Sequence, residues 1–521
     1  MTGISILEVF RRRLPADSAL RGKIENYLAH PESYPVTRDL GLEMVRHTPL
    51  VVAAEPFLAR ALARTTVDAD RTNLLAALGV TFTFRAHHDG AIQVYGGLAR
   101  SDPHYRPELG DALFEAGRFA DAAKIYAEII DGNYGIARAR ADAHGGPITQ
   151  LLSPARTVCI RYGEMANKLD FYSKARALGL VPPVHAILAA PPDLVVNRSF
   201  LDYWRDQGRS SFTVLSDSKD IADAVATHSG AAHHLDYVRL PSGRVEHRQL
   251  AYSAIQKMWD DQRRPPLLAL APEHRARGRA ALKRLGVPEN AWFAALHIRE
   301  ASSHGENVPW NPNALRGADI STYGPAIEAI VARGGYVIRM GDPSLTRLAP
   351  MKNVVDYAHL DEADRADWLD VFCCAASRFF LGSVSGPPYV GWVFGVPMIG
   401  TNWFPTGYWP FSSRDIFIPK LLRRRDGSFL NIRDAVRPPI AGTAFPGFYT
   451  ARGLEVVDNR PEDIAAAATE MMDRLDGRLV YDEDDDRLQQ RFREKARFDS
   501  LVINARIGRD FLRNHRFLIG T

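Results

Sequence analysis

The spacing of hydrophobic positions divides the chain into a helical part and a part where strands and helices alternate. Up to about residue 150 the apolar residues recur at helical spacing, as in the segment Leu58–Arg64. Beyond it, short apolar runs predict strands at 157–161, 184–189 and 212–215, with helices between them. Strands that alternate with helices predict a parallel sheet covered on both faces.

A second alternation begins after a segment at 265–289 that is rich in proline and charge. Its apolar runs predict strands at 293–298, 336–340, 354–355, 378–381 and 397–400. Helical patterns lie at 323–332, 368–376, 462–475 and 487–497. The sequence therefore predicts an α/β chain with two Rossmann-like units.

These patterns predict four parts of the chain. They are a helical region over 1–150, a first Rossmann-like domain over 151–280, a second over 281–480, and closing helices over 481–521. In such sheets the ligand lies outside the carboxyl ends of the strands. Candidate chemistry is therefore expected in the residues that directly follow strands.

The helical region contains a weak internal repeat. Leu78-Gly79 recurs as Leu109-Gly110, and Ala91–Tyr95 recurs as Ala122–Tyr126. The second copy, over 109–122, resembles a tetratricopeptide hairpin, in which small residues lie where two helices cross and aromatic residues fill the groove. Tetratricopeptide arrays usually hold three or more repeats of ~34 residues. The resemblance implies a surface for a protein partner, and two imperfect copies slightly favour the alternative of a helical cap.

Composition and charge exclude several classes of protein. With 46% hydrophobic and 24% charged residues, the chain is neither disordered nor fibrous. A net charge of +4 gives no nucleic-acid footprint. The three cysteines, Cys159, Cys373 and Cys374, lack the spacing of a zinc site or a disulfide framework, so we expect a cytoplasmic protein.

Membrane and nucleotide motifs narrow the picture further. No apolar run approaches the ~18 residues of a membrane span, and the short apolar start precedes Arg11-Arg12-Arg13 rather than following it. We expect at most a peripheral contact with a membrane. Neither a G-x-x-x-x-G-K-[ST] nor a G-x-G-x-x-G motif is present, which argues against a kinase, an ATPase or a simple dehydrogenase.

Polar residues follow three predicted strands of the second alternation. The first strand is followed by His297, Arg299 and Glu300, the second by Arg339, Gly341 and Asp342, and the fourth by Ser383, Ser385 and Gly386. Guanidinium groups and helix N-termini both bind phosphate oxygens. Together they predict a diphosphate site, although each has a structural explanation by itself: an ion pair, a core histidine or a helix cap.

These residues resemble a family of bacterial glycosyltransferases found among surface-polysaccharide and protein-glycosylation genes. The resemblance rests on the segments 296–300, 334–343, 379–386 and 394–397, and it covers about 290–420. The order of motifs is also similar to that of the fucosyltransferase superfamily, which has the two-domain GT-B fold and a His-x-Arg that contacts the diphosphate of a GDP-sugar. The resemblance implies a GT-B fold and a nucleotide diphosphate sugar, with GDP-fucose or a related GDP-sugar as the first candidate and no metal or other cofactor.

The resemblance implies roles for the matched residues around the diphosphate. Arg299 would be catalytic, because it would neutralise the β-phosphate as this becomes the leaving group, and His297 would sit beside it. Ser383, Ser385 and the N–H of Gly386 would hold phosphate oxygens.

Three further residues complete the implied donor site. Asp342 would orient the ribose or the base from its loop. Arg339 would be a second phosphate ligand, with a structural ion pair as a nearly equal alternative. Tyr357, in the loop after 354–355, would line the base through backbone groups.

The first alternation is expected to supply the acceptor side. Glu164 follows the predicted strand at 157–161, in a segment loosely similar to the Gly-Glu-x-x-Asn loop of protein O-fucosyltransferases, where the glutamate is proposed as the base. A carboxylate can take the proton of an acceptor hydroxyl. A helix-start carboxylate is an equal alternative, and Glu300, His304 and Glu306 are rival bases.

Two charged runs have structural explanations that are preferred. The acidic run 482–486 is similar to the metal-binding Asp-x-Asp of the other glycosyltransferase fold, but a solvated helix start is expected. Lys420 and Arg423-Arg424-Arg425 form a basic patch that would meet a lipid-linked acceptor or an anionic membrane, whereas an exposed, salt-bridged loop is expected.

The predicted function is sugar transfer to a hydroxyl of a glycan, lipid or protein acceptor. The resemblance implies a reaction that inverts the anomeric centre without a metal. Two alternatives stay open: a non-catalytic interaction scaffold built on the helical repeats, and a two-domain sugar-nucleotide epimerase, which would release a changed sugar without an acceptor.

Overall fold

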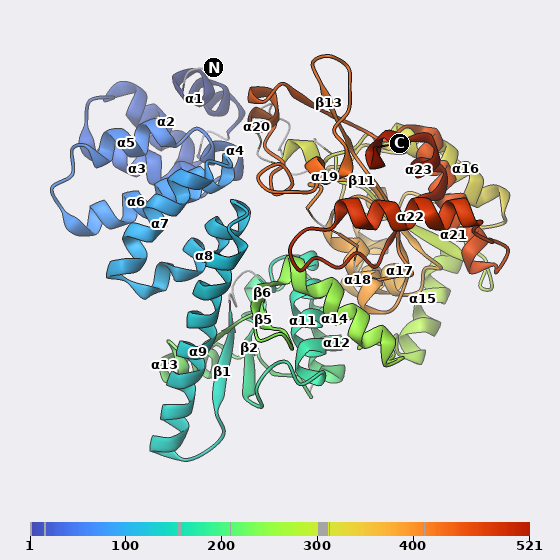
Figure 1. Cartoon of the computed structure of the whole chain (residues 1–521), viewed down its shortest axis with the longest axis horizontal. Coiled ribbons are helices and arrows are strands. Elements are labelled where there is room, and N and C mark those ends of the chain that lie inside the picture. Colours follow the sequence, from blue (N-terminus) through green and yellow to red (C-terminus); the bar gives the residue numbers. More distant parts are fainter. Residues whose placement is uncertain are drawn as a thin grey trace. The chain divides into compact units, whose positions relative to one another are not determined.

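The computed structural model describes residues 3–14, 17–153, 158–208, 210–300, 311, 313–407, 409–410 and 412–520. The chain divides into two compact units (Figure 1). The first comprises Met1–Ile125, Gly305–Leu315 and Arg437–Glu455, and the second comprises Tyr126–His304, Arg316–Val436 and Val456–Thr521. Among the described residues, no helix combines the length and the apolar character that crossing a membrane requires.

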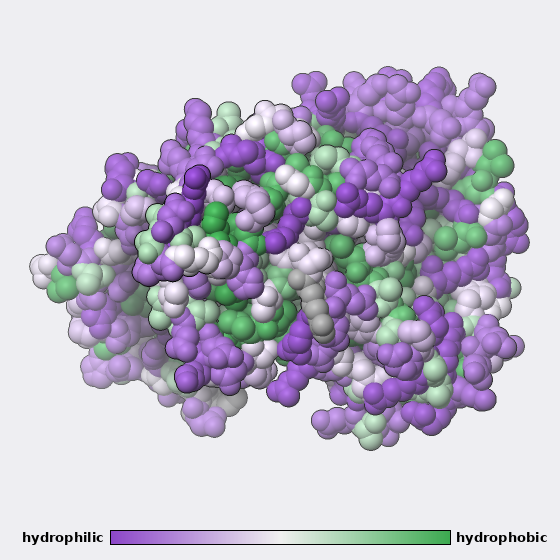
Figure 2. Space-filling view, turned by 90° about the horizontal axis from the view of Figure 1, so that it is seen from below, coloured by the Kyte–Doolittle hydropathy of each residue, from purple (hydrophilic) through white to green (hydrophobic). Residues whose placement is uncertain are grey.

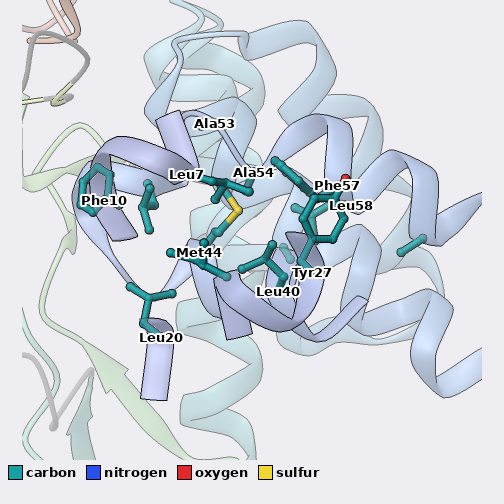
Figure 3. Packing of buried hydrophobic residues seen from close by; sticks show 14 of the residues in the cluster. Leu7, Phe10, Leu20, Tyr27, Leu40, Met44, Ala53, Ala54, Phe57 and Leu58 are labelled. Carbon is teal, nitrogen blue, oxygen red and sulfur yellow. The ribbon is translucent and has the colours of Figure 1, made fainter. Parts of the chain in front are cut away.

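The first unit is built from helices. They are α1 (Gly3–Arg13), α2 (Ala19–Ala29), α3 (Tyr34–Val45), α4 (Thr48–Val51), α5 (Glu55–Leu62), α6 (Asp68–Phe84), α7 (His88–Ser101), η1 (Pro103–Tyr105), α8 (Arg106–Glu115), η4 (Ala314–Arg316, at the unit's edge) and α20 (Pro446–Ala451). The apolar faces of α1 to α6 share a core in which Leu7, Leu40, Met44 and Leu58 are fully buried (Figure 3). The helical spacing of the sequence thus reflects one buried stripe per helix.

The first copy of the internal repeat forms the pair α6 and α7. A Cβ atom on Gly79 would lie 2.5 Å from the ring of Tyr95, so only glycine lets this ring lie against α6. The likeness to tetratricopeptide repeats, which rests on the second copy over 109–122, stays a prediction.

The second unit contains a four-stranded parallel sheet of order β3-β2-β1-β4. Its strands are β1 (Thr149–Ser153), β2 (His185–Ala189), β3 (Thr213–Leu215) and β4 (Ala232–His234), and a small hairpin follows with β5 (Tyr237–Arg239) and β6 (Val245–His247). The accompanying helices are α9 (Phe119–His144, whose first residues up to Ile125 belong to the first unit), α11 (Tyr162–Ala177), η2 (Pro192–Leu194), α12 (Arg198–Gln207), α13 (Ser218–His228) and α14 (Arg248–Asp261).

The predicted strand at 157–161 is wrong. The strand lies earlier, at Thr149–Ser153; Val158 is helical, and a turn at residues 159–160 precedes α11. Val158 and Cys159 are fully buried outside any strand. Burial outside a sheet produced the apolar run, and a short apolar run does not distinguish the two cases. Residue 157 lies outside the described residues.

A seven-stranded sheet forms the rest of the second unit, with the order β15-β12-β11-β10-β7-β8-β9 and parallel pairing throughout. From β9 to β12 this is the 3-2-1-4-5-6 order of doubly wound sheets. The strands are β7 (Phe293–His297), β8 (Tyr336–Arg339), β9 (Val354–Val355), β10 (Phe380–Gly382), β11 (Met398–Trp403), β12 (Ile416–Pro419) and β15 (Arg506–Ile507), and β13 (Leu421–Arg424) pairs separately with β14 (Leu454–Val457).

Helices and short 3₁₀ turns surround this sheet. They are α15 (Pro272–Arg284), η5 (Ile320–Tyr323), α16 (Gly324–Ala332), η6 (Tyr357–His359), η7 (Glu362–Asp364), α17 (Asp367–Ala375), α18 (Gly386–Val393), α19 (Ile432–Ala435), α21 (Pro461–Leu475), α22 (Glu483–Ala496), α23 (Arg509–Asn514) and η8 (Arg516–Ile519). All five strands predicted after residue 290 are present, with small differences at their ends. Strands β12 and β15 have no counterpart in the prediction.

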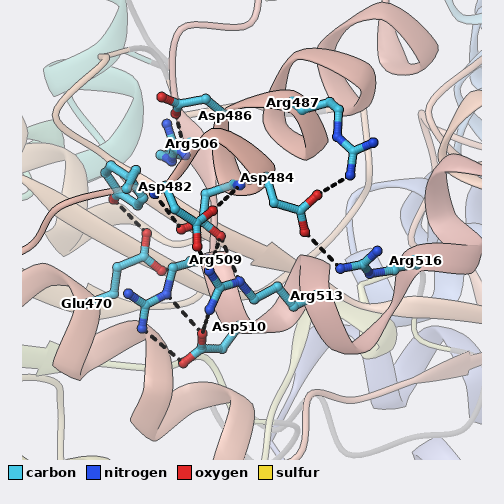
Figure 4. A network of polar contacts seen from close by, with 12 residues as sticks. Glu470, Asp482, Asp484, Asp486, Arg487, Arg506, Arg509, Asp510, Arg513 and Arg516 are labelled. Atoms are coloured by element: carbon cyan, nitrogen blue, oxygen red, sulfur yellow. Dashed lines mark hydrogen bonds and ion pairs between the residues drawn. The ribbon is translucent and has the colours of Figure 1, made fainter.

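The two charged runs of the sequence, 482–486 and 420–425, both lie in the second unit. Asp482 caps α22 and forms a capping box with Asp485, so the acidic run is a helix start, as predicted. Most of the run is exposed to solvent and is also ion-paired, because Arg506 binds Asp486 and Arg513 binds Asp482 and Asp485 (Figure 4). The placement of Lys420 in an exposed patch is wrong.

Lys420 is only 4% exposed and forms an ion pair with Asp458 at 2.6 Å. The surface elsewhere is mixed: Figure 2 shows a face that is hydrophilic over most of its area, with hydrophobic residues between. Exposed apolar side chains such as Val67 and Val480 come from distant parts of the sequence. Scattered residues of this kind are normal for a folded protein and mark no site.

Candidate functional site

Helices from the two sheets of the second unit meet at their N-termini. A Cβ atom on Gly386, the first residue of α18, would lie 2.9 Å from the Cβ of Tyr162 and 3.0 Å from the nitrogen of Gly163, at the start of α11. A Cβ on Gly163 would lie 3.3 Å from the Cα of Gly386. The two backbones therefore touch, and the contact requires glycine on at least one side.

Neither helix start is capped by a side chain. The N-cap residues, Arg161 of α11 and Ser385 of α18, make no side-chain capping bond. Ser385 is 8% exposed, and its hydroxyl has no hydrogen-bond partner within the described residues. Each helix N-terminus carries a partial positive charge. Two such ends in contact favour an anion beside them, and a buried hydroxyl is ready to bind one.

The strand ends predicted to share one edge lie side by side. Gly382 at the end of β10 pairs with His297 at the end of β7, and β8 flanks β7 on its other side. The Nδ1 atom of His297 lies 3.0 Å from the carbonyl oxygen of Met340. Burial lowers the pKa of His297 to about 4. The ring is therefore neutral, Nδ1 carries the hydrogen because a carbonyl only accepts, and Nε2 is an acceptor.

Two arginines border the loop between β10 and α18. The main-chain N–H of Arg299 donates to the Ser383 hydroxyl at 3.0 Å, which ties this loop to the end of β7. Arg316 donates from Nη2 to the carbonyl oxygen of Val384 at 2.9 Å. Ser383 is fully buried. Arg316 is a candidate that the sequence did not indicate, because no strand or motif precedes it.

The side chain of Arg339 forms ion pairs with two carboxylates inside the protein. Its side chain is fully buried, with Nη2 2.7 Å from Glu300 and Nη1 3.2 Å from Asp356. Glu300 also accepts the N–H of Thr346 at 2.8 Å. This is the structural alternative that the sequence left open for Arg339, and it engages both oxygens of the rival base Glu300.

The other two rival bases, His304 and Glu306, lie outside the described residues. Asp342 lies in the turn after β8, where its Oδ1 accepts the N–H of Ser344 at 2.9 Å. Asp342 therefore stabilises its own loop, and the loop adjoins the end of β8.

Tyr357 points into the protein rather than toward an open surface. It is 1% exposed, and its hydroxyl donates to Oδ1 of Asp370 at 2.6 Å. The hydroxyl of Tyr162 donates to Oδ2 of the same carboxylate at 3.3 Å. Burial raises the pKa of Asp370 to about 6. Asp370 thus joins the start of α11 to the segment after β9.

Glu164 lies in the first turn of α11, so the predicted loop after a strand is wrong and the helix-start alternative describes its position. Its Oε2 lies 3.1 Å from the ammonium of Lys168, which also binds Asp236 at 2.7 Å. Arg248 binds the other oxygen of Asp236 at 3.0 Å. Residues four apart lie on the same face of a helix, so the spacing of Glu164 and Lys168 in the sequence already indicated this pair.

No protein-family model matches the chain, and no curated protein sequence matches it. Among solved structures, the chain is similar to the glycosyl transferase family 9 protein from Veillonella parvula DSM 2008, with a TM-score of 0.31 and 10% sequence identity. The similarity covers 52% of this chain and 85% of that chain. A likeness at this level assigns neither a family nor an activity.

Proposed function

We propose that this protein is a glycosyltransferase that moves a sugar from a nucleotide diphosphate sugar to a hydroxyl of a glycan, lipid or protein acceptor. GDP-fucose or a related GDP-sugar is the first candidate for the donor. The observation that carries the proposal is the meeting of two uncapped helix N-termini at Gly163 and Gly386, beside the buried hydroxyl of Ser385. A diphosphate is the anion that suits such a place.

On the donor side, positive groups would stabilise the diphosphate as it leaves. The two helix starts, with Arg299 and Arg316 bordering the loop, would face the charge that develops on the β-phosphate oxygen. The proposal needs no metal, because guanidinium groups and helix ends supply the positive charge. His297, being neutral, would accept a hydrogen bond at Nε2 from a sugar or ribose hydroxyl rather than neutralise phosphate.

On the acceptor side, Glu164 would act as the general base. As the acceptor oxygen attacks the anomeric carbon, its proton passes to the Glu164 carboxylate. The bond between the anomeric carbon and the β-phosphate oxygen breaks, and the nucleoside diphosphate leaves with that electron pair. A single displacement of this kind inverts the anomeric centre. The Glu164 side chain is 34% exposed, so an acceptor can reach it.

A thermal-shift screen tests the donor side. UDP, GDP, CDP, ADP and dTDP are added, with and without EDTA, to the wild type, Arg299→Ala and the control Arg378→Ala. Arg378 stands just before β10, at the opposite edge of the same sheet, and pairs there with Asp476. A ligand that binds only the folded state stabilises it by about 2.7 kcal/mol at a hundred times its Kd.

We expect one nucleotide to raise Tm in the wild type and in Arg378→Ala but not in Arg299→Ala, with or without EDTA. No shift with any nucleotide at millimolar concentration would contradict the proposal, and a shift abolished by EDTA would overturn its metal-free part. Incubation with the matching sugar nucleotide then separates the activities. A transferase releases nucleoside diphosphate only as a sugar-bearing product forms, whereas an epimerase returns an isomeric sugar nucleotide without an acceptor.

A further inference from the structure

Four charged side chains form a chain at the carboxyl edge of the four-stranded sheet. Arg248, at the start of α14, binds Asp236, which follows β4; Asp236 binds Lys168 of α11. Lys168 binds Glu164, one turn earlier on the same helix. In the order β3-β2-β1-β4, the direction of winding reverses between β1 and β4. This is the point of a doubly wound sheet where ligands bind.

Burial changes along the chain of charges. The side chains of Lys168, Arg248 and Asp236 are 8%, 14% and 17% exposed, whereas that of Glu164 is 34% exposed. A buried ammonium or carboxylate is costly unless it is paired, and each buried member is paired here. Glu164 is therefore the end that opens to solvent.

The charges balance only when Glu164 is ionised. Two cations face two carboxylates, and protonation of Glu164 would leave one positive charge in excess. Burial alone would raise the pKa of Asp236, but Lys168 and Arg248 lower it well below its usual value.

Two neighbouring groups leave this balance unchanged. Burial lowers the pKa of His247, beside Asp236, to about 3, so the imidazole adds no charge at neutral pH. Burial also raises the pKa of Tyr252, on α14, well above its usual value, so the phenol stays neutral.

We propose that Lys168 is a positioning residue for Glu164 and is itself held in place by Asp236 and Arg248. These ion pairs keep the Glu164 carboxylate ionised and fixed toward the acceptor. The inference rests on the proposed function, because it assigns a purpose to the base of that reaction. Lys168 binds Oε2 of Glu164. The other oxygen, Oε1, has no recorded partner among the described residues and is available to an acceptor hydroxyl.

The four linked charges predict that substitutions of two of them have opposite effects on the protonation of Glu164. Lys168→Met removes the cation beside Glu164, so protonation of the Glu164 carboxylate becomes more favourable than in the wild type. Asp236→Asn removes an anion and leaves two cations near Glu164, so protonation of that carboxylate becomes less favourable. A merely structural role would give a loss of stability in both variants and no reversal of sign.

Lys174→Met is the matched control. Lys174 lies on the same helix, is as buried as Lys168, and pairs with Asp170 at 2.7 Å instead of with Glu164. Its loss is expected to lower stability without changing the titration of Glu164. Lys168→Arg keeps the positive charge and is expected to restore the wild-type titration, which covers the case in which Lys168→Met folds poorly.

The experiment has two readouts on the full-length protein. The first is the carboxyl ¹³C titration of Glu164 in protein labelled at glutamate, with the resonance assigned through Glu164→Gln. The second is the pH profile of donor consumption, with GDP-fucose, UDP-N-acetylglucosamine and dTDP-rhamnose as donor probes. We expect the acidic limb to move up by about one pH unit in Lys168→Met, which is a loss of about tenfold below the limb and little loss above it.

The outcomes separate the two claims. Opposite titration shifts in Lys168→Met and Asp236→Asn, with the control unchanged, support the inference. Unchanged titration, shifts of the same sign, or an acidic limb that stays in place while turnover continues would overturn it. Absence of turnover in the wild type with every donor probe would count against the proposed function instead, and the titration would still decide whether Lys168 sets the ionisation of Glu164.

Discussion

The two sheets of the second unit use charge at their carboxyl edges in different ways. At the seven-stranded sheet, Arg339 is fully buried between Glu300 and Asp356, so its charge is part of the fold. At the four-stranded sheet, the chain from Arg248 ends at Glu164, whose side chain is one-third exposed. A charged residue after a strand is thus either enclosed by partners or left open to a ligand, and only the open kind is available for chemistry.

The enclosed arginine of the seven-stranded sheet, Arg339, gives the largest expected effect on stability. Arg339→Met leaves two carboxylates, Glu300 and Asp356, without their buried cation, so we expect a loss of about 4 kcal/mol in the free energy of unfolding. Urea unfolding measures it. Arg333→Met is the control, because Arg333 is partly exposed in its pair with Asp473 and should cost less than about 1 kcal/mol. Similar losses in both variants would show that Arg339 is not enclosed as described.

The next effect depends on pH. The pKa of Asp370 is raised to about 6 by burial, from a usual value of 3.8. The folded state therefore holds this proton more tightly than the unfolded state. The contribution of Asp370 to stability is therefore greatest below pH 4 and is lost as the pH rises to 6, by about 3 kcal/mol.

Asp370→Asn removes the ionisation and keeps an acceptor for Tyr357 and Tyr162. We expect the fall in unfolding free energy between pH 4 and pH 6.5 to be smaller in this variant than in the wild type. Chemical unfolding at several pH values gives both curves. Parallel curves over this range would refute the assignment to Asp370.

The contact between the two helix starts gives an intermediate effect. Gly386→Ala places a Cβ within 3.0 Å of the Gly163 backbone, so the helices must separate, and we expect a loss of about 2 kcal/mol. Gly324→Ala, at the start of α16, is the control, since nothing lies within 4 Å of its added Cβ. Thermal unfolding compares the two variants, and tolerance of both would show that the contact is looser than described.

The partly exposed carboxylate of Glu164, at the four-stranded sheet, gives the smallest expected effect on stability. Glu164→Gln removes one charge from a partly exposed pair, so the free energy of unfolding should change by less than about 1 kcal/mol. Under the proposed function, turnover should fall by about a hundredfold or more. A large loss of stability with turnover retained would place Glu164 among the enclosed charges and reverse the comparison.

Much of the fold could be predicted from the sequence, because long-range order follows from local periodicity in an α/β chain. The runs at 293–298, 336–340 and 378–381 are strands of one sheet, and its winding brings their carboxyl ends together. The run at 157–161 was a wrong strand prediction because Val158 and Cys159 are buried outside the sheet. Strand β15 has only two residues, too few for a periodic signal.

The site could be predicted only in part, because partners far apart in sequence decide what a charge does. Glu300 and Asp356 enclose Arg339 from 39 and 17 residues away. Asp236 reaches Lys168 from 68 residues away. Hydrophobic spacing locates strand ends but carries no information on which carboxylate meets which cation, so the assignment of roles needed the three-dimensional arrangement.

The two prolines at the start of α18 have a consequence for binding entropy. Pro387 and Pro388 follow Gly386, and each has a fixed φ that already suits a helix. They also supply no N–H group, so Ser385 and Gly386 provide the only N–H groups at this helix start that the helix itself does not use. An arriving anion thus meets few donors on a backbone that is ordered before it binds, so little conformational freedom is lost on association.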